Sequence, residues 1–241
     1  MSATAKRVAI VQSNYIPWKG YLDLINSVDE FILLDEVQYT RRDWRNRNRI
    51  KTPQGVIWLT IPVNVKGRYE QRIDETTVSD PSWAEKHWQT LHHSYASALH
   101  FDDFSGPVQA AYLGLESDRL SDINRHMLEA VSGMLGIDTP LRSSTDYEGG
   151  GRKTERLLGL CLAAGAAEYV SGPAAKAYLD ESAFHAAGVE VSYFDYGGYP
   201  EYEQPYPPFE HSVSVLDLIF STGKDARNYM KSFSATAADH A

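Results

Sequence analysis

The stretch VAIVQSNYIPWKGYLDLINSVDEFILL, residues 8–34, decides the fold class. Its two ends, 8–11 and 31–34, are continuous apolar runs, the pattern of strands that are buried on both faces in a parallel sheet. Between them, apolar residues at helical spacing predict a helix over 20–27. A strand, a turn, a helix and a second strand make a Rossmann-like βαβ opening, so we expect an α/β protein with a mainly parallel sheet.

The rest of the chain continues this alternation after an interruption. A third strand is predicted over 56–63, and two helices over 83–99 and 108–135 fill the middle third. The last third returns to helix, strand, helix and strand, over 153–164, 168–171, 181–187 and 189–194. The proline- and tyrosine-rich segment 196–209 is too aromatic for a linker, so we expect an ordered extended segment laid over the domain.

This pattern predicts one α/β domain over 1–233, with a helical insertion at about 81–140 and a disordered tail at 234–241. The formal net charge of −9 argues against general nucleic-acid binding, which needs a broad basic face. The single cysteine, Cys161, excludes an internal disulfide, and no signal peptide or membrane span is evident. We expect a cytoplasmic protein, and the oligomeric state stays open.

The turn after the first strand carries the first group of candidate residues. Ligands of open α/β sheets bind beyond the carboxyl ends of the strands, where this turn lies. Its candidate side chains for binding or catalysis are Gln12, Asn14, Tyr15, Trp18 and Lys19. The alternative is that the turn is only structural, but turn formation does not explain its glutamine, asparagine and lysine.

The second strand ends in Asp35 and Glu36, at the same edge of the sheet. Because neighbouring strand residues point to opposite faces, only one of the two is expected to face the site, and we favour Asp35. A carboxylate there could hold a sugar hydroxyl, bind Mg²⁺ through phosphates, or accept a proton from an amine. The alternative is a solvated strand end.

A cluster of positive charge follows on this acidic chain. Arg45, Arg47 and Arg49 alternate, so they share one face if the segment is extended, and Asn48 lies between two of them. Guanidinium groups bind phosphate or carboxylate through paired hydrogen bonds. We expect an anionic ligand here, with a diphosphate as the first choice. A solvated edge strand is the alternative.

Two other groups are weaker candidates. Lys153 follows three glycines and opens a predicted helix, where backbone N–H groups could bind an anion, although the Walker spacing is absent. The histidines of the middle third do not have metal-ligand spacing, so no metal site is predicted.

Several of these segments together resemble the WbqC-like family. The resemblance is carried by QSNYIPWKGY at 12–21, LDEVQY at 34–39, RNRIK at 47–51 and WLTIPV at 58–63, and by shorter matches as far as about residue 230. It implies a role in bacterial surface-polysaccharide or modified amino-sugar biosynthesis. It also places Gln38 within a matching segment, and we include it among the substrate-binding candidates.

A more distant similarity is to the nucleotidylyltransferase superfamily, whose first strand leads into a His-x-Gly-His turn. The corresponding residues here are Trp18, Lys19, Gly20 and Tyr21, so the glycine is present and both histidines are absent. If the superfamily's nucleotide binding is retained, Tyr21, Lys19 and the arginines would have to stabilise the phosphates.

The leading hypothesis is therefore a transferase that moves an acyl or aminoacyl group, such as glycyl, to the amine of a nucleotide-linked amino sugar. Asp35, Lys19 and Tyr15 are its candidate catalytic residues. The donor is open between an adenylate made from ATP with Mg²⁺, a group on a carrier protein, and an aminoacyl-tRNA. The alternatives are a nucleotidylyltransferase-like or ligase enzyme, and a non-catalytic binding or scaffold protein of a polysaccharide assembly.

Overall fold

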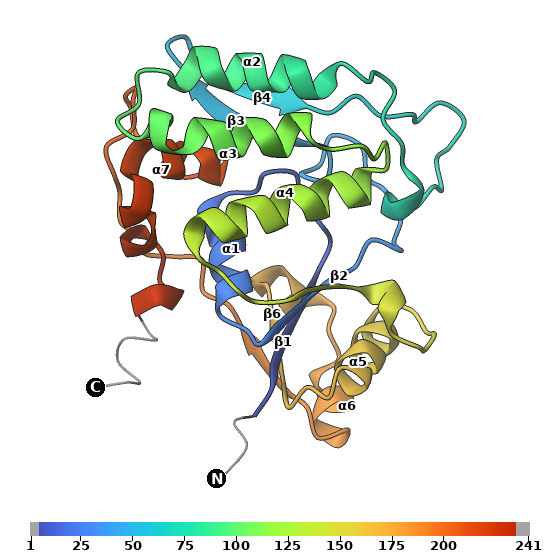
Figure 1. Ribbon diagram of the computed structural model, residues 1–241. Helices are drawn as coiled ribbons and strands as arrows, with labels where there is room; N and C mark the ends of the chain where they lie inside the picture. Colours follow the sequence, from blue (N-terminus) through green and yellow to red (C-terminus); the bar gives the residue numbers. More distant parts are fainter. Residues whose placement is uncertain (1–4, 235–241) are drawn as a thin grey trace.

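A five-stranded parallel sheet occupies the lower part of the molecule (Figure 1). The computed structural model describes residues 5–234. The strand order is β5-β2-β1-β6-β7. The strands are β1 (Arg7–Val11), β2 (Glu30–Leu33), β5 (Leu141–Ser143), β6 (Glu168–Ser171) and β7 (Glu190–Tyr193).

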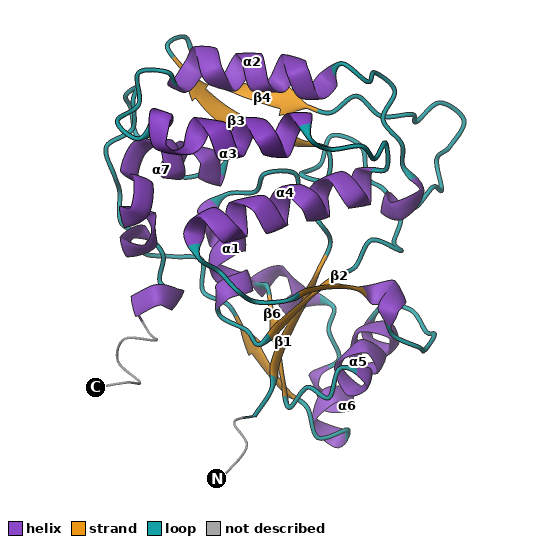
Figure 2. Ribbon diagram, viewed as in Figure 1, coloured by secondary structure: helices purple, strands orange, loops and turns teal. Residues whose placement is uncertain are grey.

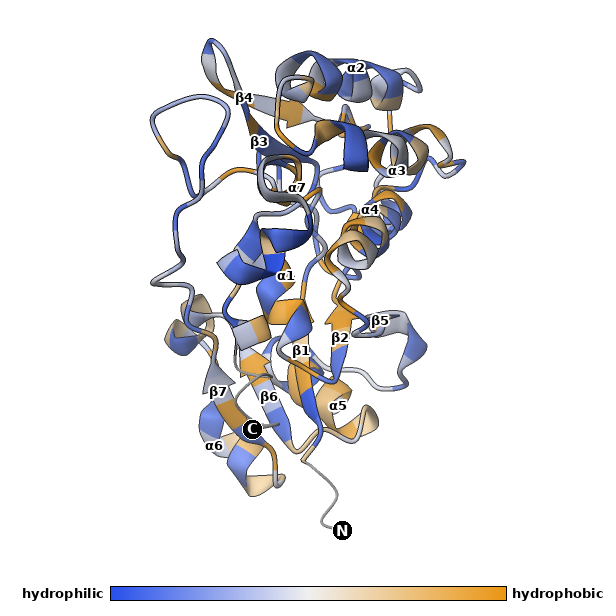
Figure 3. Ribbon diagram, turned by 60° about the vertical axis from the view of Figure 1, so that its left-hand side comes forward, coloured by the Kyte–Doolittle hydropathy of each residue, from blue (hydrophilic) through white to orange (hydrophobic). Residues whose placement is uncertain are grey.

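Both faces of this sheet are buried, which explains the continuous apolar runs. Val8 and Ile10 of β1 pack in a cluster with Leu160 of α5 and Phe184 of α6, whereas Ala9, between them, belongs to the main core on the other face. Figure 3 shows the hydrophobic colouring of β1, β2 and β6 in the middle of the sheet. The covering helices are α1 (Lys19–Asn26), α5 (Thr154–Ala163) and α6 (Glu181–Ala186).

A second group of elements lies above the sheet in Figure 2. It consists of an antiparallel hairpin and the helices that pack beside it. These elements are β3 (Arg47–Thr52), β4 (Gly55–Thr60), α2 (Trp83–Tyr95), α3 (Phe101–Leu113), α4 (Leu120–Leu135) and α7 (Val215–Thr222). Short 3-10 helices are η1 (Ile73–Glu75), η2 (Ser144–Asp146), η3 (Pro173–Ala177) and η4 (Gly223–Tyr229).

The predicted α/β class, with its parallel sheet and βαβ opening, is confirmed. The strand predicted over 56–63 is β4, and it pairs with β3 outside the parallel sheet. The division into one domain with an insertion at 81–140 stays a prediction. The predicted tail, 234–241, lies outside the described residues apart from Ser234.

The prediction of a single helix over 108–135 is wrong, because the structure has two helices, α3 and α4, in this region. The connection between them is held by backbone hydrogen bonds to the segment before α2: the N–H of Val78 donates to the carbonyl of Asp118, and the N–H of Leu120 donates to that of Thr76. Tertiary hydrogen bonds therefore interrupt a stretch that is helical by its local pattern. Gly136 ends α4 with a left-handed backbone, as helix-terminating glycines do.

The aromatic segment 196–209 contains no helix or strand, bends at 205–208 and packs against the domain. The hydroxyl of Tyr199 donates to the buried carboxylate of Asp23 on α1 at 2.7 Å, and that of Tyr202 donates to Asp217 on α7 at 2.7 Å. The segment therefore ties α1 to α7 through buried tyrosines.

Candidate functional site

The turn after β1 is held by polar side chains from three other parts of the chain. The backbone N–H of Ser13 donates to the Asp35 carboxylate at 2.8 Å, and the buried amide of Asn124 donates to the Ser13 hydroxyl at 2.9 Å. The guanidinium of Arg45 donates to the carbonyls of Gln12 and Ser13, and also to the side chain of Asn14. The sheet edge predicted to carry the site is therefore a cluster of hydrogen-bonded polar groups.

Asn48 of β3 completes the support of this turn. Its amide donates to the carbonyls of Tyr15 and Ile16, at 3.0 and 2.9 Å. Ile16 has a φ of 34°, in the left-handed region that a β-branched residue rarely adopts. Strain of this kind persists only where the surroundings enforce it, and it is often found at functional sites.

An open pocket of about 230 Å³ lies beside this strained turn. Its walls come from the turn, from the loop before β3 and from the segment before α7. The lining residues are Asn14, Pro17, Trp18, Trp44, Asn48 and Ser212. We call it the indole pocket, because it contains two indole side chains.

The position of Trp18 in this pocket depends on Gly20. A Cβ atom on Gly20 would lie 2.4 Å from the Trp18 ring, so the indole lies directly against the first turn of α1. Trp18 also contacts Tyr196 and Tyr199, with ring centroids 5.6 Å apart in both pairs. Gly20 therefore makes room for an aromatic ring.

The three alternating arginines do not act as one group. Arg45 precedes β3 and turns inward, where it holds the turn after β1. Arg47 and Arg49 lie on one face of the hairpin, and the register places Trp58 of β4 opposite Arg49. The Arg47 guanidinium lies 4.0 Å from the centre of the Trp58 ring.

This side of the hairpin forms a surface of cationic and aromatic groups next to the indole pocket. Trp44 and Trp58 are 38% and 44% exposed, and their ring centroids are 5.3 Å apart. The surface is called the hairpin face below, and its members are Trp44, Arg47, Arg49, Val56 and Trp58. An arginine stacked on an indole is held in place before any ligand arrives.

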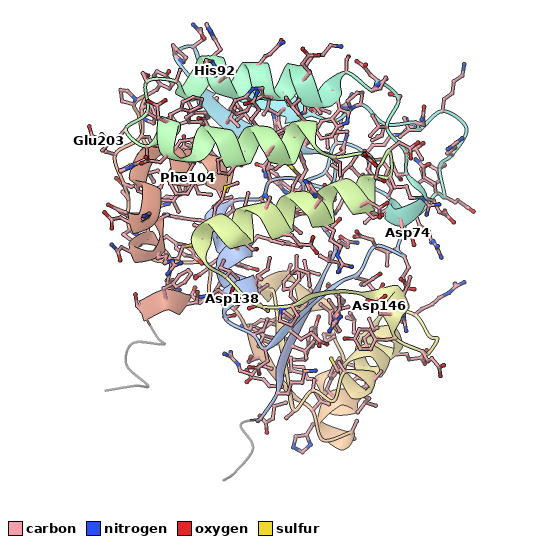
Figure 4. All side chains as sticks on the ribbon, viewed as in Figure 1. Asp74, His92, Phe104, Asp138, Asp146 and Glu203 are labelled. Carbon is pink, nitrogen blue, oxygen red and sulfur yellow. The ribbon has the colours of Figure 1, made fainter. Side chains whose placement is uncertain are left out.

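Asp35, the carboxylate that the sequence predicts for the site, is buried, with 5% of its surface exposed. Burial raises the pKa of Asp35, although the hydrogen bonds from Ser13 and the charge of Arg45 act in the opposite direction. Asp74, whose N–H donates to the Asp35 carbonyl at 3.0 Å, lies at the level where the sheet meets the upper helices (Figure 4). Glu36 instead pairs with the buried Arg156 of α5 at 2.6 Å.

Tyr15 faces away from the indole pocket. Its side chain is fully buried, and its hydroxyl contacts His87 Nδ1 of α2 at 2.8 Å and the hydroxyl of Tyr112 of α3 at 2.6 Å. Burial raises the pKa of Tyr15 well above its usual value. Tyr15 therefore joins the turn to the helices above the sheet.

Lys19 is directed toward the aromatic segment. Its ammonium donates to the Pro200 carbonyl at 2.8 Å and lies 5.3 and 5.1 Å from the ring centres of Tyr199 and Tyr202. Burial lowers the pKa of Lys19 to about 8, and the nearby charge of Asp23 acts against this shift. In the structure Lys19 anchors the segment rather than lining the indole pocket.

The remaining candidates are spread around the sheet edge. Tyr21 is buried and donates to the Gln12 carbonyl at 2.9 Å. Gln38 is exposed and donates to the Tyr69 carbonyl at 2.9 Å. Lys153 is exposed before α5 with a φ of 52°, and it does not line the indole pocket. Of the substrate-binding candidates, Asn14, Trp18 and Asn48 line this pocket.

Sequence reasoning missed several residues that the structure brings to the site. Trp44 and Ser212 line the indole pocket, and Trp58 stacks under Arg47. Trp58 had a usable signal, because a hairpin turn at Pro53 would place it opposite Arg49. Ser212 had none, since it arrives from the other end of the chain.

The fold and the pocket define an α/β protein with a candidate ligand site at the carboxyl edge of a parallel sheet. The chain matches the model of the WbqC-like protein family over residues 12–229, and it therefore belongs to this family. It is 51% identical over 226 residues to Rv1507c, an uncharacterized protein of Mycobacterium tuberculosis, and the match covers 94% of this chain and 98% of that protein. No solved structure matches the chain.

Residues 5–234 contain neither a metal-binding cluster nor a membrane-spanning helix. Within this range there is no cluster of three or more histidine, cysteine or acidic side chains placed to hold a metal ion. None of the helices in the same range has both the length and the apolar character needed to cross a membrane.

Proposed function

We propose that this protein is an enzyme of bacterial surface-polysaccharide or modified amino-sugar biosynthesis. It transfers an acyl or aminoacyl group, such as glycyl, to the amine of a nucleotide-linked amino sugar. The observation that carries this proposal is a pocket with two indole side chains, formed in part by the turn that the buried Asp35 carboxylate holds at the carboxyl ends of β1 and β2. Family membership supports the pathway, and the pocket supports the chemistry.

The indole pocket suits a sugar ring. Trp18 and Trp44 offer large apolar ring surfaces, while Asn14 and Asn48 supply polar groups beside them. Small-molecule sites commonly combine apolar walls with a few placed polar groups in this way. The strained turn keeps these walls in position without the ligand.

Asp35 is the group that we propose as general base. Its carboxylate accepts a hydrogen bond from the backbone N–H of Ser13, the residue before the pocket-lining Asn14. In the transfer, the amine nitrogen attacks the acyl carbonyl and forms the new C–N bond. The donor's leaving group departs with the electron pair of its bond to that carbonyl carbon. The amine proton passes to Asp35 through an intervening water, because Asp35 itself does not line the pocket. A raised pKa makes Asp35 a stronger base than an exposed aspartate.

Nucleotidyl transfer is less well supported by the same site. The two positions that are histidine in the related superfamily are Trp18, which lies against the start of α1, and Tyr21, which donates to a backbone carbonyl. A scaffold role that uses the aromatic segment 196–209 is also less well supported, because Tyr199 and Tyr202 are buried within the domain.

Ligand-induced thermal shift tests the binding part of the proposal. UDP-glucosamine or a dTDP-linked amino sugar, at millimolar concentration, should raise the melting temperature of the wild type. The shift should disappear in Trp18→Ala and persist in Tyr69→Ala, which removes an aromatic side chain that is 80% exposed outside the pocket. No shift with either sugar nucleotide, or with ATP, would refute the proposal.

Product analysis tests the transfer itself. After incubation with UDP-glucosamine, glycine, ATP and Mg²⁺, mass spectrometry should detect the N-glycylated sugar nucleotide. A carrier-bound glycyl group and glycyl-tRNA are the donors to compare in parallel. Asp35→Asn should bind the sugar nucleotide and fail to form product with any donor, and full product formation by this variant would exclude Asp35 as the base.

A further inference from the structure

The indole pocket is too small for a whole sugar nucleotide. Its volume is about 230 Å³, whereas sites that enclose a drug-sized ligand have about 300–1,000 Å³. If the proposed function is right, the pocket encloses only one part of the ligand. The other part must then lie on the surface that borders the pocket.

The usual place for a phosphate in such a fold is not available. Anions bind at helix N-termini, where backbone N–H groups and the helix dipole face them. Here the Trp18 indole covers the first turn of α1, within 2.4 Å of a Cβ placed on Gly20. A diphosphate cannot approach the backbone at this glycine while the ring is there.

The hairpin face continues directly from the pocket. Trp44 belongs to both, since it lines the pocket and contacts Trp58. Arg49 reaches the wall of the pocket that Ser212 forms, because its Nε donates to the carbonyl of Ser212 at 3.0 Å. Exposed indoles of this kind offer stacking surfaces for a nucleobase.

The charges on this face suit a small anion. Arg49 has one acidic partner, Glu210, at 3.6 Å. Arg47 forms no salt bridge with any carboxylate of the described part of the chain, and its guanidinium is held by the Arg42 carbonyl and the Trp58 ring. Asp43, the carboxylate whose pKa the Arg47 charge helps to lower, pairs with Arg45 at 3.8 Å. The positive charge that remains on Arg47 and Arg49 favours a diphosphate. The overall net charge of −9 argues against a nucleic acid as the occupant.

We infer that the hairpin face is a subsite for the nucleoside diphosphate of the ligand. Arg47 and Arg49 bind the diphosphate, the exposed indoles stack on the base, and the sugar enters the indole pocket. This orientation brings the sugar amine toward the turn that carries Asn14. Asp35 lies on the far side of this turn, where it accepts a hydrogen bond from Ser13. The inference rests on the proposed function and adds the direction in which the ligand lies.

Titration calorimetry with UDP, dTDP and UDP-glucosamine tests this subsite. Trp58→Ala and Arg47→Gln should each weaken the binding of UDP by about tenfold, the effect of losing one stacking contact or charge-assisted hydrogen bond. Arg142→Gln on β5 and Tyr69→Ala are the matched controls, since they remove an exposed arginine and an exposed tyrosine outside the hairpin face. Both controls should bind UDP as the wild type does.

A pocket-filling variant tests the orientation. Ser212→Leu should weaken the binding of UDP-glucosamine by at least about tenfold and leave that of UDP within about twofold. If both hairpin-face variants bind UDP and UDP-glucosamine like the wild type, the subsite is wrong although the proposed function stands. If Ser212→Leu loses UDP as well, the nucleotide occupies the pocket and the orientation is wrong. If the wild type binds none of the three ligands, both proposals fail.

Discussion

Acidification should destabilise this protein through one buried side chain, His87 of α2. Its Nε2 lies 3.2 Å from the Thr60 carbonyl, which can only accept, so Nε2 carries the proton. Its Nδ1 therefore accepts from the Tyr15 hydroxyl at 2.8 Å, and Tyr15 in turn accepts from Tyr112 at 2.6 Å. Protonation of Nδ1 would remove the acceptor at the end of this chain of hydrogen bonds.

The size of the effect follows from the pKa of His87. Burial lowers it from 6.5 to about 4, so the folded state disfavours the proton that the unfolded state binds. The stabilising contribution of the neutral ring is therefore complete above the unfolded pKa and is lost as the pH falls from 6.5 toward 4. With 1.36 kcal/mol for each pKa unit, the free energy of unfolding should fall by about 2 kcal/mol between about pH 8 and about pH 5 from this group alone.

Urea denaturation at both pH values measures this fall. His87→Gln is the matched variant, because an amide can accept from Tyr15 and donate to Thr60 without titrating. The free energy of unfolding of the wild type should fall by about 2 kcal/mol more than that of the variant. The other titrating groups are the same in both proteins, so their contributions cancel in this difference. An equal fall in both proteins would refute the reasoning, as would an NMR titration that places the His87 pKa near 6.5.

Three further substitutions have expected effects on stability. Gly20→Ala should destabilise by about 1–3 kcal/mol and weaken the UDP-glucosamine shift, because its methyl group would displace Trp18; an unchanged indole fluorescence spectrum would contradict this. Gly133→Ala in α4 should stabilise by up to about 1 kcal/mol in urea denaturation, since a Cβ placed there would have no neighbour within 4 Å apart from the backbone of its own helix. A loss of stability would show that the added methyl group does not fit. Asp217→Asn should destabilise by about 3 kcal/mol, because this buried carboxylate accepts from two tyrosines and a glutamine. The exposed Asp225→Asn should change the melting curve little, and equal melting curves for the two variants would refute the role of Asp217.

Local patterns predicted the sheet well because burial on both faces leaves a direct mark on the sequence. The strands at 7–11 and 30–33 were recognisable as apolar runs, and the helix between them by its spacing. The boundary between α3 and α4 was missed, although Gly114 ends α3 as its C-cap residue; hydrogen bonds to residues 76–78 hold the connection in place. Those residues are distant in the chain, and helical spacing carries no information about them.

The candidate site was predictable to the level of its location. The carboxyl ends of β1 and β2 do meet, as the parallel arrangement requires, and Asp35 bonds to Ser13 there. The role of each polar side chain was not predictable. Lys19 and Arg45 have the residue types of ligand-binding groups. Yet Lys19 donates to a backbone carbonyl of this chain, and Arg45 donates to two backbone carbonyls and to the Asn14 side chain.

The sequence by itself determined the α/β class, the sheet edge that carries the candidate site, and the shared face of Arg47 and Arg49, because each depends on a short period or on adjacent residues. Tertiary structure alone decided that Trp18 and Trp44 line one pocket with Ser212, and that Tyr15 faces the helices instead. The physical reason is that a side chain takes the direction that satisfies its hydrogen bonds and packing. Those partners come from distant segments, such as Pro200, which lies 181 residues from Lys19, and only the folded chain brings them together.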